Sequence, residues 1–288
     1  MTIILVGETG VGKTAFMSLL ANVFAGRQID HFCLEHNTNN ESQLSKNQSQ
    51  TNKAMMYTFR RGGCTLRILD TPGLCDTRGL EHDKEHKASI AEAIRAEVQT
   101  LDGVIIMANG TLERVGPGVE YAIHTLSTMF PRSIVNIIGF LFTNVPDALS
   151  FNFQSNTLPE ALRNAERWTI QNPVAQFVKY QETISGNSSR PPSEQKRRAL
   201  QRLLHSNFAI TMETLNSFFA WLDKRSPQPT NVIVQLYEMT TRIEAAISNV
   251  LAQIDQKEQQ RMDLQRLQAN LERSNQVSLD RLLLCLFV

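Results

Sequence analysis

The chain is short of net charge, of cysteine and of long apolar runs, and each shortage excludes a class of protein. Its 288 residues carry a formal net charge of +1, so neither nucleic acid nor an anionic membrane is expected as the main partner. No stretch approaches the ~20 apolar residues that span a bilayer. No transmembrane segment is therefore expected, and no signal peptide, because the apolar run at residues 3–6 follows Met1 almost directly.

The four cysteines are scattered, and this scatter indicates a reducing environment. They are Cys33, Cys64, Cys75 and Cys285, and no two of them form a CxxC pair. The spacing argues against a zinc ribbon and against a disulfide framework. The predicted location is the cytoplasm.

What the chain does have is the composition of an ordinary globular protein, with 42% apolar and 20% charged residues. Over the first 150 residues, apolar runs that fit buried strands alternate with stretches that fit helices. Strands are expected at residues 3–6, 57–60, 65–69, 104–107 and 134–142, and helices at 15–24, 84–100 and 119–130. This alternation predicts an α/β fold, a three-layer sandwich whose mainly parallel sheet is covered on both faces.

Beyond Ser150 the strand pattern disappears and an all-helical C-terminal extension is predicted. Helices are expected near residues 158–171, 173–182, 193–222 and 230–275, separated by proline-containing breaks. Three parts are therefore predicted: an α/β domain over 1–150, a helical extension packed on it over 151–229, and a long helix or weak coiled coil with an apolar tail over 230–288.

The turn after the first strand carries a complete phosphate-binding motif, which predicts a P-loop NTPase. Residues 7–14 read GETGVGKT and satisfy GxxxxGK[ST], between a strand and a helix. The glycines let backbone N–H groups surround a phosphate, and the helix adds its positive dipole end. Lys13 is expected to reach the β- and γ-phosphates, and the Thr14 hydroxyl to bind Mg²⁺. The predicted nucleotide-binding residues here are Gly7, Glu8, Thr9, Gly10, Val11, Gly12, Lys13 and Thr14.

A second motif, DTPG, begins where the strand at residues 65–69 ends. Asp70 after an apolar strand can hold the water shell of Mg²⁺, and the Gly73 amide is placed to sense a γ-phosphate. DTPG alone is a common tetrapeptide. Here it lies behind a second strand after the P-loop, which is the position that a GTPase switch requires.

The third motif concerns the base. Residues 142–147, FTNVPD, follow the strand expected at 134–142, where GTPases read guanine with an NKxD-like motif. Asn144 and Asp147 keep the Asn-x-x-Asp spacing, and the Asp147 carboxylate would accept hydrogen bonds from guanine N1 and the exocyclic amine. Val145 stands where a lysine normally stacks on the base. A polar turn leaving a strand is the alternative interpretation of these residues.

Together these motifs resemble those of the AIG-type, immune-associated and septin-like P-loop GTPases, a branch of the TRAFAC class that includes the chloroplast import-receptor GTPases. Residues 69–79, LDTPGLCDTRG, are similar to the extended switch II of AIG-type proteins, and residues 142–147 to their base-recognition stretch. The resemblance covers roughly residues 1–150. It implies a G domain with GTP and Mg²⁺ as ligands.

The resemblance also implies a switch I threonine that closes on Mg²⁺ in the triphosphate state. Thr51 is the best match by its position before the second strand, and Thr38 is the second candidate. The predicted metal-binding residues are Thr14, Thr51 and Asp70, and the predicted catalytic residues are Lys13, Thr51 and Gly73.

Hydrolysis is the open point, because Leu74 occupies the position at which Ras-type enzymes orient the attacking water. Either hydrolysis is slow, or a polar group comes from Arg78 or His82, or from a second protomer across a homodimer interface on the nucleotide face. The leading interpretation is a slow GTPase switch that self-association activates. The alternatives are a nucleotide-bound scaffold without turnover and a P-loop ATPase.

The last expected helix, residues 230–275, contains neither proline nor glycine and supports two interpretations. Polar residues interrupt its heptad pattern, so we expect weak self-association rather than a tight autonomous zipper. Alternatively, Ile243, Ile247, Val250 and Ile254, at i, i+4, i+7 and i+11, form a stripe that would pack the helix on the nucleotide domain. We expect the first half of the helix to dock in this way, and the second half to project and to self-associate weakly.

Overall fold

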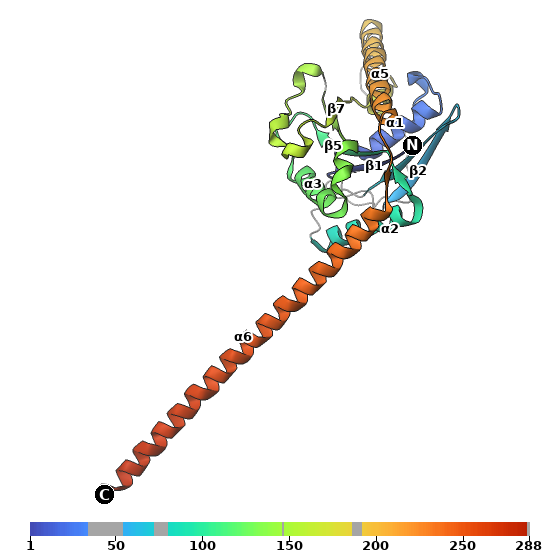
Figure 1. The fold of residues 1–288 in the computed structure, drawn as a ribbon. Coiled ribbons are helices and arrows are strands. Elements are labelled where there is room, and N and C mark those ends of the chain that lie inside the picture. The colour runs from blue at the N-terminus through green and yellow to red at the C-terminus, as the bar shows by residue number, and fades with distance from the viewer. Residues whose placement is uncertain (34–53, 72–79, 146, 186–191, 287–288) are drawn as a thin grey trace. The chain divides into compact units, whose positions relative to one another are not determined.

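The computed structural model describes residues 1–33, 54–71, 80–145, 147–185 and 192–286 of the chain (Figure 1). The chain divides into two compact units, Met1–Tyr237 and Glu238–Val288. The first unit contains the sheet and the shorter helices. The second unit consists of the greater part of the last helix.

The first unit is built on a sheet in which six described strands lie in the order β2-β3-β1-β5-β6-β7. β2 pairs antiparallel with β3, and the other neighbouring strands pair parallel. The carboxyl ends of β1 and β5 meet where the strand order reverses, which is where open α/β sheets bind ligands. The strands are β1 (Thr2–Gly7), β2 (Met55–Arg61), β3 (Cys64–Asp70), β5 (Gly103–Asn109), β6 (Ile138–Thr143) and β7 (Glu166–Thr169), with a separate antiparallel pair β4 (Thr100–Leu101) and β8 (Gln228–Pro229).

Helices cover both faces of the sheet, so the predicted three-layer α/β sandwich is confirmed (Figure 1). One face packs against α1, α4 and α5. The opposite face packs against α2, α3 and the first turn of α6. The helices are α1 (Lys13–Phe24), α2 (Leu80–Glu97), α3 (Pro117–Met129), α4 (Pro173–Ile184), α5 (Glu194–Asp223) and α6 (Asn231–Leu286). Short 3₁₀ helices are η1 (Ile29–His31), η3 (Arg132–Ile137), η4 (Ala148–Ser150), η5 (Ser155–Thr157) and η6 (Glu160–Leu162).

The expectation of a helix over residues 158–171, with no strand after Ser150, is wrong. β7 lies within that stretch and pairs parallel with β6, with Leu141 opposite Trp168. The strand is at the sheet edge, and in its sequence ERWT only Trp168 is buried. A single buried position gives no apolar periodicity, so the pattern could not reveal this strand.

An aromatic cluster fixes α5 against the edge of the sheet. The Trp168 ring of β7 meets Phe218 and Trp221 of α5 edge to face, with centroids 5.1 Å apart in both pairs. Trp168 Nε1 also donates a hydrogen bond to Ser217 Oγ at 3.3 Å. The rings lie over Gly139 of β6, where an added Cβ would come within 2.7 Å of the Trp168 ring. Helix α5 is therefore part of the core of the first unit.

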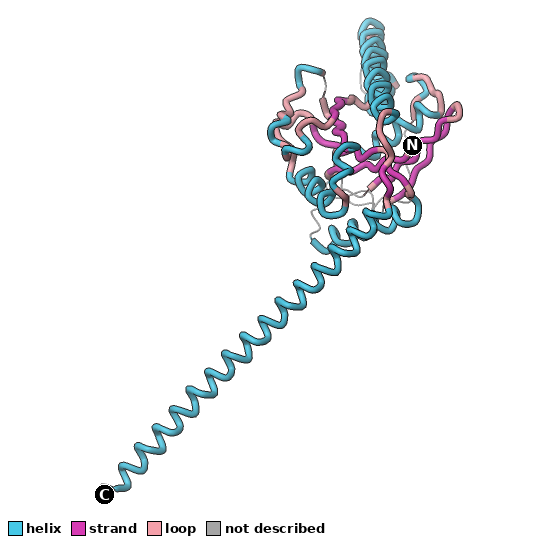
Figure 2. Tube along the Cα trace, in the orientation of Figure 1, coloured by secondary structure: helices cyan, strands magenta, loops and turns pink. Residues whose placement is uncertain are grey.

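The second unit is one continuous helical stretch (Figure 2). α6 has 56 residues and continues past the expected end at residue 275. Within the described residues, no helix has both the length and the apolar character needed to cross a membrane. Large apolar side chains of this unit are exposed, namely Met239, Ile243, Ile247, Val250, Leu251, Ile254, Met262, Leu264, Leu267 and Leu271.

Replacement of Phe218 by alanine is expected to lower the free energy of unfolding by about 3–5 kcal/mol, the usual cost of deleting a buried phenylalanine ring. Phe218 is 1% exposed, whereas Leu203 on the same helix is 57% exposed. The matched control Leu203→Ala should cost less than about 1 kcal/mol. Urea denaturation followed by far-UV circular dichroism measures both. A loss below about 1 kcal/mol for Phe218→Ala would show that α5 unfolds separately from the sheet.

Candidate functional site

The turn between β1 and α1 has the backbone geometry of a phosphate-binding loop. β1 ends at Gly7 and α1 begins at Lys13. Between them Gly10 and Gly12 have φ values of 80° and 98°, a region that residues with a Cβ rarely adopt. Gly12 caps α1 without any side-chain hydrogen bond, so the first N–H groups of the helix stay available to an anion.

The Glu8 side chain packs against the start of α3 and is not placed to be a ligand. Its carboxylate lies against Gly116 and its Cβ against Gly118, at the start of α3. A negative charge is favourable near a helix N-terminus. Glu8 can therefore serve a bound phosphate only through its backbone.

Lys13 and Asp70 are two buried, opposite charges at this turn. They are 6% and 3% exposed. Lys13 Nζ donates to the carbonyl oxygens of Gly7 at 3.0 Å and Glu8 at 3.2 Å. Asp70 is the last residue of β3 and stands opposite Leu5 in the parallel register with β1. The sheet pairing therefore brings Asp70, the first residue of the DTPG motif, next to the strand that leads into the P-loop.

Burial moves both groups toward their neutral forms. It raises the pKa of Asp70 from 3.8 to about 6, and the charge of Lys13 opposes part of that rise. Burial also lowers the pKa of Lys13, and the charges of Asp70 and Glu8 oppose this fall. Other groups of the protein therefore do not fully balance either charge. A ligand that carries both phosphate and a cation would supply what each lacks.

Two buried oxygens at the site find no hydrogen-bond partner among the described residues: Asp70 Oδ1 and Thr9 Oγ1. Beside Asp70, the Thr71 hydroxyl donates to the Leu5 carbonyl oxygen at 2.6 Å and fixes the end of β3. A buried carboxylate oxygen without a donor suits Mg²⁺, a hard cation that is bound by oxygen and keeps several waters. Thr14, partly buried on the first turn of α1, provides a hydroxyl. The residues present fit the metal.

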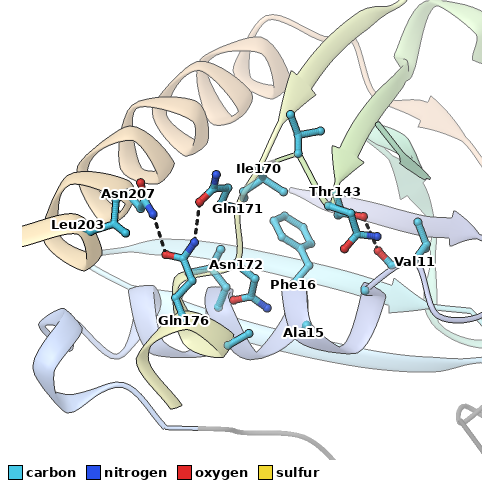
Figure 3. Close-up of a pocket in the computed structure, with 15 residues that line it drawn as sticks. Val11, Ala15, Phe16, Thr143, Ile170, Gln171, Asn172, Gln176, Leu203 and Asn207 are labelled. Atoms are coloured by element: carbon cyan, nitrogen blue, oxygen red, sulfur yellow. Dashed lines mark hydrogen bonds between the residues drawn. The ribbon is translucent and has the colours of Figure 1, made fainter. Parts of the chain in front are cut away.

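The end of β6 is tied to the P-loop by one hydroxyl. Thr143 Oγ1 donates to the Val11 carbonyl oxygen at 2.7 Å (Figure 3). Asn144 follows with φ 61°, the left-handed conformation that asparagine tolerates better than most residues. Val145 is 3% exposed and joins the core. This inward orientation explains why an apolar residue stands where a base-stacking lysine is usual.

Asp147 is exposed, and its carboxylate closes its own turn. Oδ1 accepts from the backbone N–H of Leu149 at 2.9 Å and of Ser150 at 3.0 Å, and Oδ2 accepts from the Ser150 hydroxyl at 3.0 Å. A carboxylate has about four acceptor positions, so about one remains for a ligand in this conformation. Of the two predicted base-reading residues, Asn144 lines the cavity described next and Asp147 does not.

A cavity of about 690 Å³ opens beside the P-loop (Figure 3). Its lining comes from the P-loop, α1, the ends of β6 and β7, α4 and α5, and none of these lining residues is charged. The polar groups around it are Thr143, Asn144, Gln171, Asn172, Gln176 and Asn207. Apolar walls with a few convergent hydrogen-bonding groups are typical of small-molecule sites, and the neutral groups suit a purine base.

Three of these amides form a chain that reaches from α5 to the segment after β7. Asn207 Nδ2 donates to Gln176 Oε1 at 3.2 Å, and Gln176 Nε2 donates to Gln171 Oε1 at 2.6 Å (Figure 3). Asn172 caps α4 by accepting from the Val174 N–H at 3.0 Å. The Gln171 side chain is therefore held by two helices beside the cavity.

Sequence reasoning missed these amides because they follow the unrecognised strand β7. The pair Asn172–Pro173 did carry a signal, since asparagine at the N-cap and proline at the first helical position mark a helix start. The apolar residue Ile170 lies just before this helix start. That order of residues would have indicated a loop at the edge of the sheet.

Other predicted residues lie outside the described parts of the chain and stay predictions. These are Thr38, Thr51, Gly73, Leu74 and Arg78. His82 falls within α2, and its side chain is not described. Among the described residues, no cluster of three or more His, Cys, Asp or Glu could hold a metal ion by protein ligands alone.

Comparison with known proteins extends these observations. The model of the AIG1 family matches residues 1–206. A sequence search among curated proteins gives no match. Among solved structures, a dimerization-deficient mutant of Toc33 from Arabidopsis thaliana is 15% identical, with a TM-score of 0.43, over 74% of this chain and 84% of that one.

Two further solved structures are also similar to this chain. Toc33 in complex with Mg²⁺ and GMPPNP is 15% identical, with a TM-score of 0.42, over 79% of this chain and 86% of its own. The G domain of the FeoB iron transporter from T. maritima is 13% identical, with a TM-score of 0.36, over 62% of this chain and 98% of its own. The family model matches well over half of the sequence, and the chain belongs to the AIG1 family.

Proposed function

We propose that this protein binds GTP with Mg²⁺ and hydrolyses it slowly, as a nucleotide-dependent switch in the cytoplasm. The observation that supports this most is the buried pair of Lys13 and Asp70 at the P-loop, where each charge lacks full compensation. Magnesium triphosphate carries the two charges that this pair needs. Exposed cysteines at positions 33 and 64 suit a reducing compartment.

The phosphates would lie in the turn formed by residues 7–14. The backbone N–H groups and the N-terminus of α1 supply a positive field, and no acidic residue lies in the first turn of the helix to neutralise it. Lys13 adds a charge that is now hydrogen-bonded to two carbonyl oxygens of the same turn. Gly73 would report the γ-phosphate through its amide, as the switch II resemblance implies.

Asp70 and Thr14 would hold Mg²⁺, joined by Thr51 in the triphosphate state. When bound, the ion neutralises negative charge on the phosphate oxygens. Asp70 must be ionised to take part, and burial opposes that ionisation. Near and below pH 6, binding of the metal is therefore linked to release of a proton from Asp70.

Guanine would occupy the cavity beside the P-loop. Asn144 lines that cavity, and Asp147 follows three residues later in the same turn. We infer that the Asp147 carboxylate accepts from guanine with its remaining acceptor position. Gln171, held by Gln176, lies close enough to the same cavity to complete the hydrogen bonds of the base.

Slow turnover follows from Leu74, whose side chain cannot orient a water molecule. A second protomer that docks on the nucleotide face would bring the missing polar group, and such a homodimer is part of the proposal. The same residue favours a second candidate function, a scaffold that binds GTP without turnover. Hydrolysis measurements separate the two.

Single-turnover GTP hydrolysis should be slow in dilute protein and should rise with protein concentration. Lys13→Ala should abolish both hydrolysis and triphosphate binding, because it removes the ammonium group that contacts the phosphates. The circular dichroism spectrum should stay unchanged. Fluorescent-nucleotide titration measures binding. A scaffold would bind GTP with no turnover at any concentration, and unchanged binding by Lys13→Ala would refute the P-loop assignment.

Mg²⁺-dependent nucleotide affinity should fall as pH drops through about 6. Below the pKa of Asp70, which burial raises to about 6, a proton occupies the carboxylate that the metal needs. The affinity for Mg²⁺ should then fall about tenfold for each further pH unit, and it should be flat above pH 7. Titration of Mg²⁺ into the GTP complex between pH 5 and 8 measures this. Asp70→Asn should bind weakly and lose the pH dependence; a wild-type affinity that is flat down to pH 5 would remove Asp70 from the metal site.

The base preference should depend on Asp147. Asp147→Ala should weaken GTP binding by roughly 2–4 kcal/mol, because guanine donors lose their acceptor in a desolvated cavity. Asp147→Asn should shift the preference toward xanthosine triphosphate, and the exposed Asp223→Asn should change nothing. Competition titrations with GTP, XTP and ATP give the ratios. If Asp147→Asn keeps the wild-type preference, base recognition belongs to the amides of Asn144 and Gln171.

A further inference from the structure

Helix α6 carries a stripe of four β-branched side chains in the second unit. The spacing of Ile243, Ile247, Val250 and Ile254 by four, three and four residues puts them on one side of the helix. They are 53%, 54%, 54% and 48% exposed. A contiguous exposed apolar stripe of this kind indicates a surface that another surface covers.

The stripe has defined ends. Thr240 precedes it at the same spacing, and Lys257 and Arg261 follow it at the next two positions of the seam. Beyond them, apolar and polar residues alternate along the same seam, as Leu264, Gln268 and Leu271. The continuous apolar block is therefore confined to residues 243–254.

The order of spacings in this block is symmetric. Four, three and four read the same from either end, and the midpoint falls between Ser248 and Asn249. A second copy that runs antiparallel about that midpoint sets Ile243 against Ile254 of the other copy and Ile247 against Val250. Every apolar position of the block then meets an apolar position, in the knobs-into-holes manner of paired helices.

Charge decides between the two directions of pairing. A parallel pair in register would place Lys257 against Lys257 and Arg261 against Arg261 within the seam, and like charges in a partly desolvated contact repel. In the antiparallel register Lys257 instead lies opposite Thr240 of the other copy, one helical turn from Glu244. The polar end of one stripe thus meets an uncharged residue with a carboxylate nearby.

We propose that a second copy of this chain covers the stripe in an antiparallel two-helix contact centred between Ser248 and Asn249. The contact is about three turns long, less than the ~1,000 Å² that a permanent interface needs, so the association is weak and depends on concentration. It uses no residue of the phosphate or base site. This pairing is therefore independent of nucleotide and distinct from a homodimer through the nucleotide face.

Sedimentation velocity of the full-length protein, free of nucleotide and Mg²⁺, tests the surface. Wild type should pass from monomer to dimer as its concentration rises. Ile247→Glu combined with Val250→Glu should raise the dimer dissociation constant at least tenfold. The matched control is Ala245→Glu combined with Ala252→Glu, which places the same charges on the opposite, exposed side of the same turns and should change it less than twofold.

Three results of this experiment would overturn the proposal. A wild type that stays monomeric at all concentrations would do so, and equal dissociation constants for the two double variants would do so as well. If Ile247→Glu with Val250→Glu lowers the melting temperature of a monomeric protein, the stripe is covered within one chain.

Disulfide cross-linking tests the direction. In a Cys-to-Ser background that sediments like wild type, a mixture of Ile243→Cys and Ile254→Cys proteins should form the mixed disulfide. Neither protein alone should cross-link, because two copies of residue 243 lie about 16 Å apart along an antiparallel pair, beyond disulfide reach. Disulfides between two Ile243→Cys chains would show a parallel contact and refute the register.

Discussion

A lysine and an aspartate buried at the reversal point of the sheet constrain the rest of the first unit. Charges removed from water are costly unless they are paired and hydrogen-bonded. Lys13 has two carbonyl acceptors, whereas Asp70 Oδ1 has no donor among the described residues. Binding of a metal–phosphate ligand to the folded chain would supply both charges with partners. By linkage, such a ligand also stabilises the fold.

The strand register of the sheet places Lys13 and Asp70 at the same edge. Parallel pairing sets Leu5 of β1 opposite Asp70 of β3, and Gly7 opposite Met107 of β5. These strands therefore end at the same edge, and their turns converge there. The Thr143 hydroxyl joins β6 to the same turn through Val11. The candidate phosphate and base subsites are consequently held by the core of the sheet, which is more rigid than surface loops are.

The sequence predicted the glycine-rich turn between β1 and α1 and much of the fold, because both depend on local patterns. A glycine-rich turn after a buried strand puts Lys13 at the first position of α1, and Asp70 lies at the end of β3. The cavity proposed for the base depends on residues from four separate elements. Gln171, Gln176 and Asn207 come together only because β7 joins the sheet and α5 packs on Trp168. No short-range pattern contains that information.

Asp147 shows a second limit of prediction from sequence. Its spacing from Asn144 fits a base-reading motif, but the structure has its carboxylate closing the turn at Ser150. A motif gives the type and spacing of residues and leaves the competing local hydrogen bonds undetermined. Aspartate at the start of a short helix makes such bonds readily, whatever else it does.

Most of helix α6 lies in the second unit, where the large apolar side chains that the structure describes are exposed. Isolated helices gain little stability from backbone hydrogen bonds alone, and most helical stability in proteins comes from packing of an apolar face. In the second unit the apolar stripe from Ile243 to Ile254 is half exposed. Covering it with a second copy would stabilise the helix itself as well as the dimer. Pairing would then favour the helical state of this unit, and the charges of Lys257 and Arg261 would limit the length of the paired segment. On these proposals, nucleotide recognition would depend on the buried charges of Lys13 and Asp70, and assembly would depend on the exposed apolar stripe of α6.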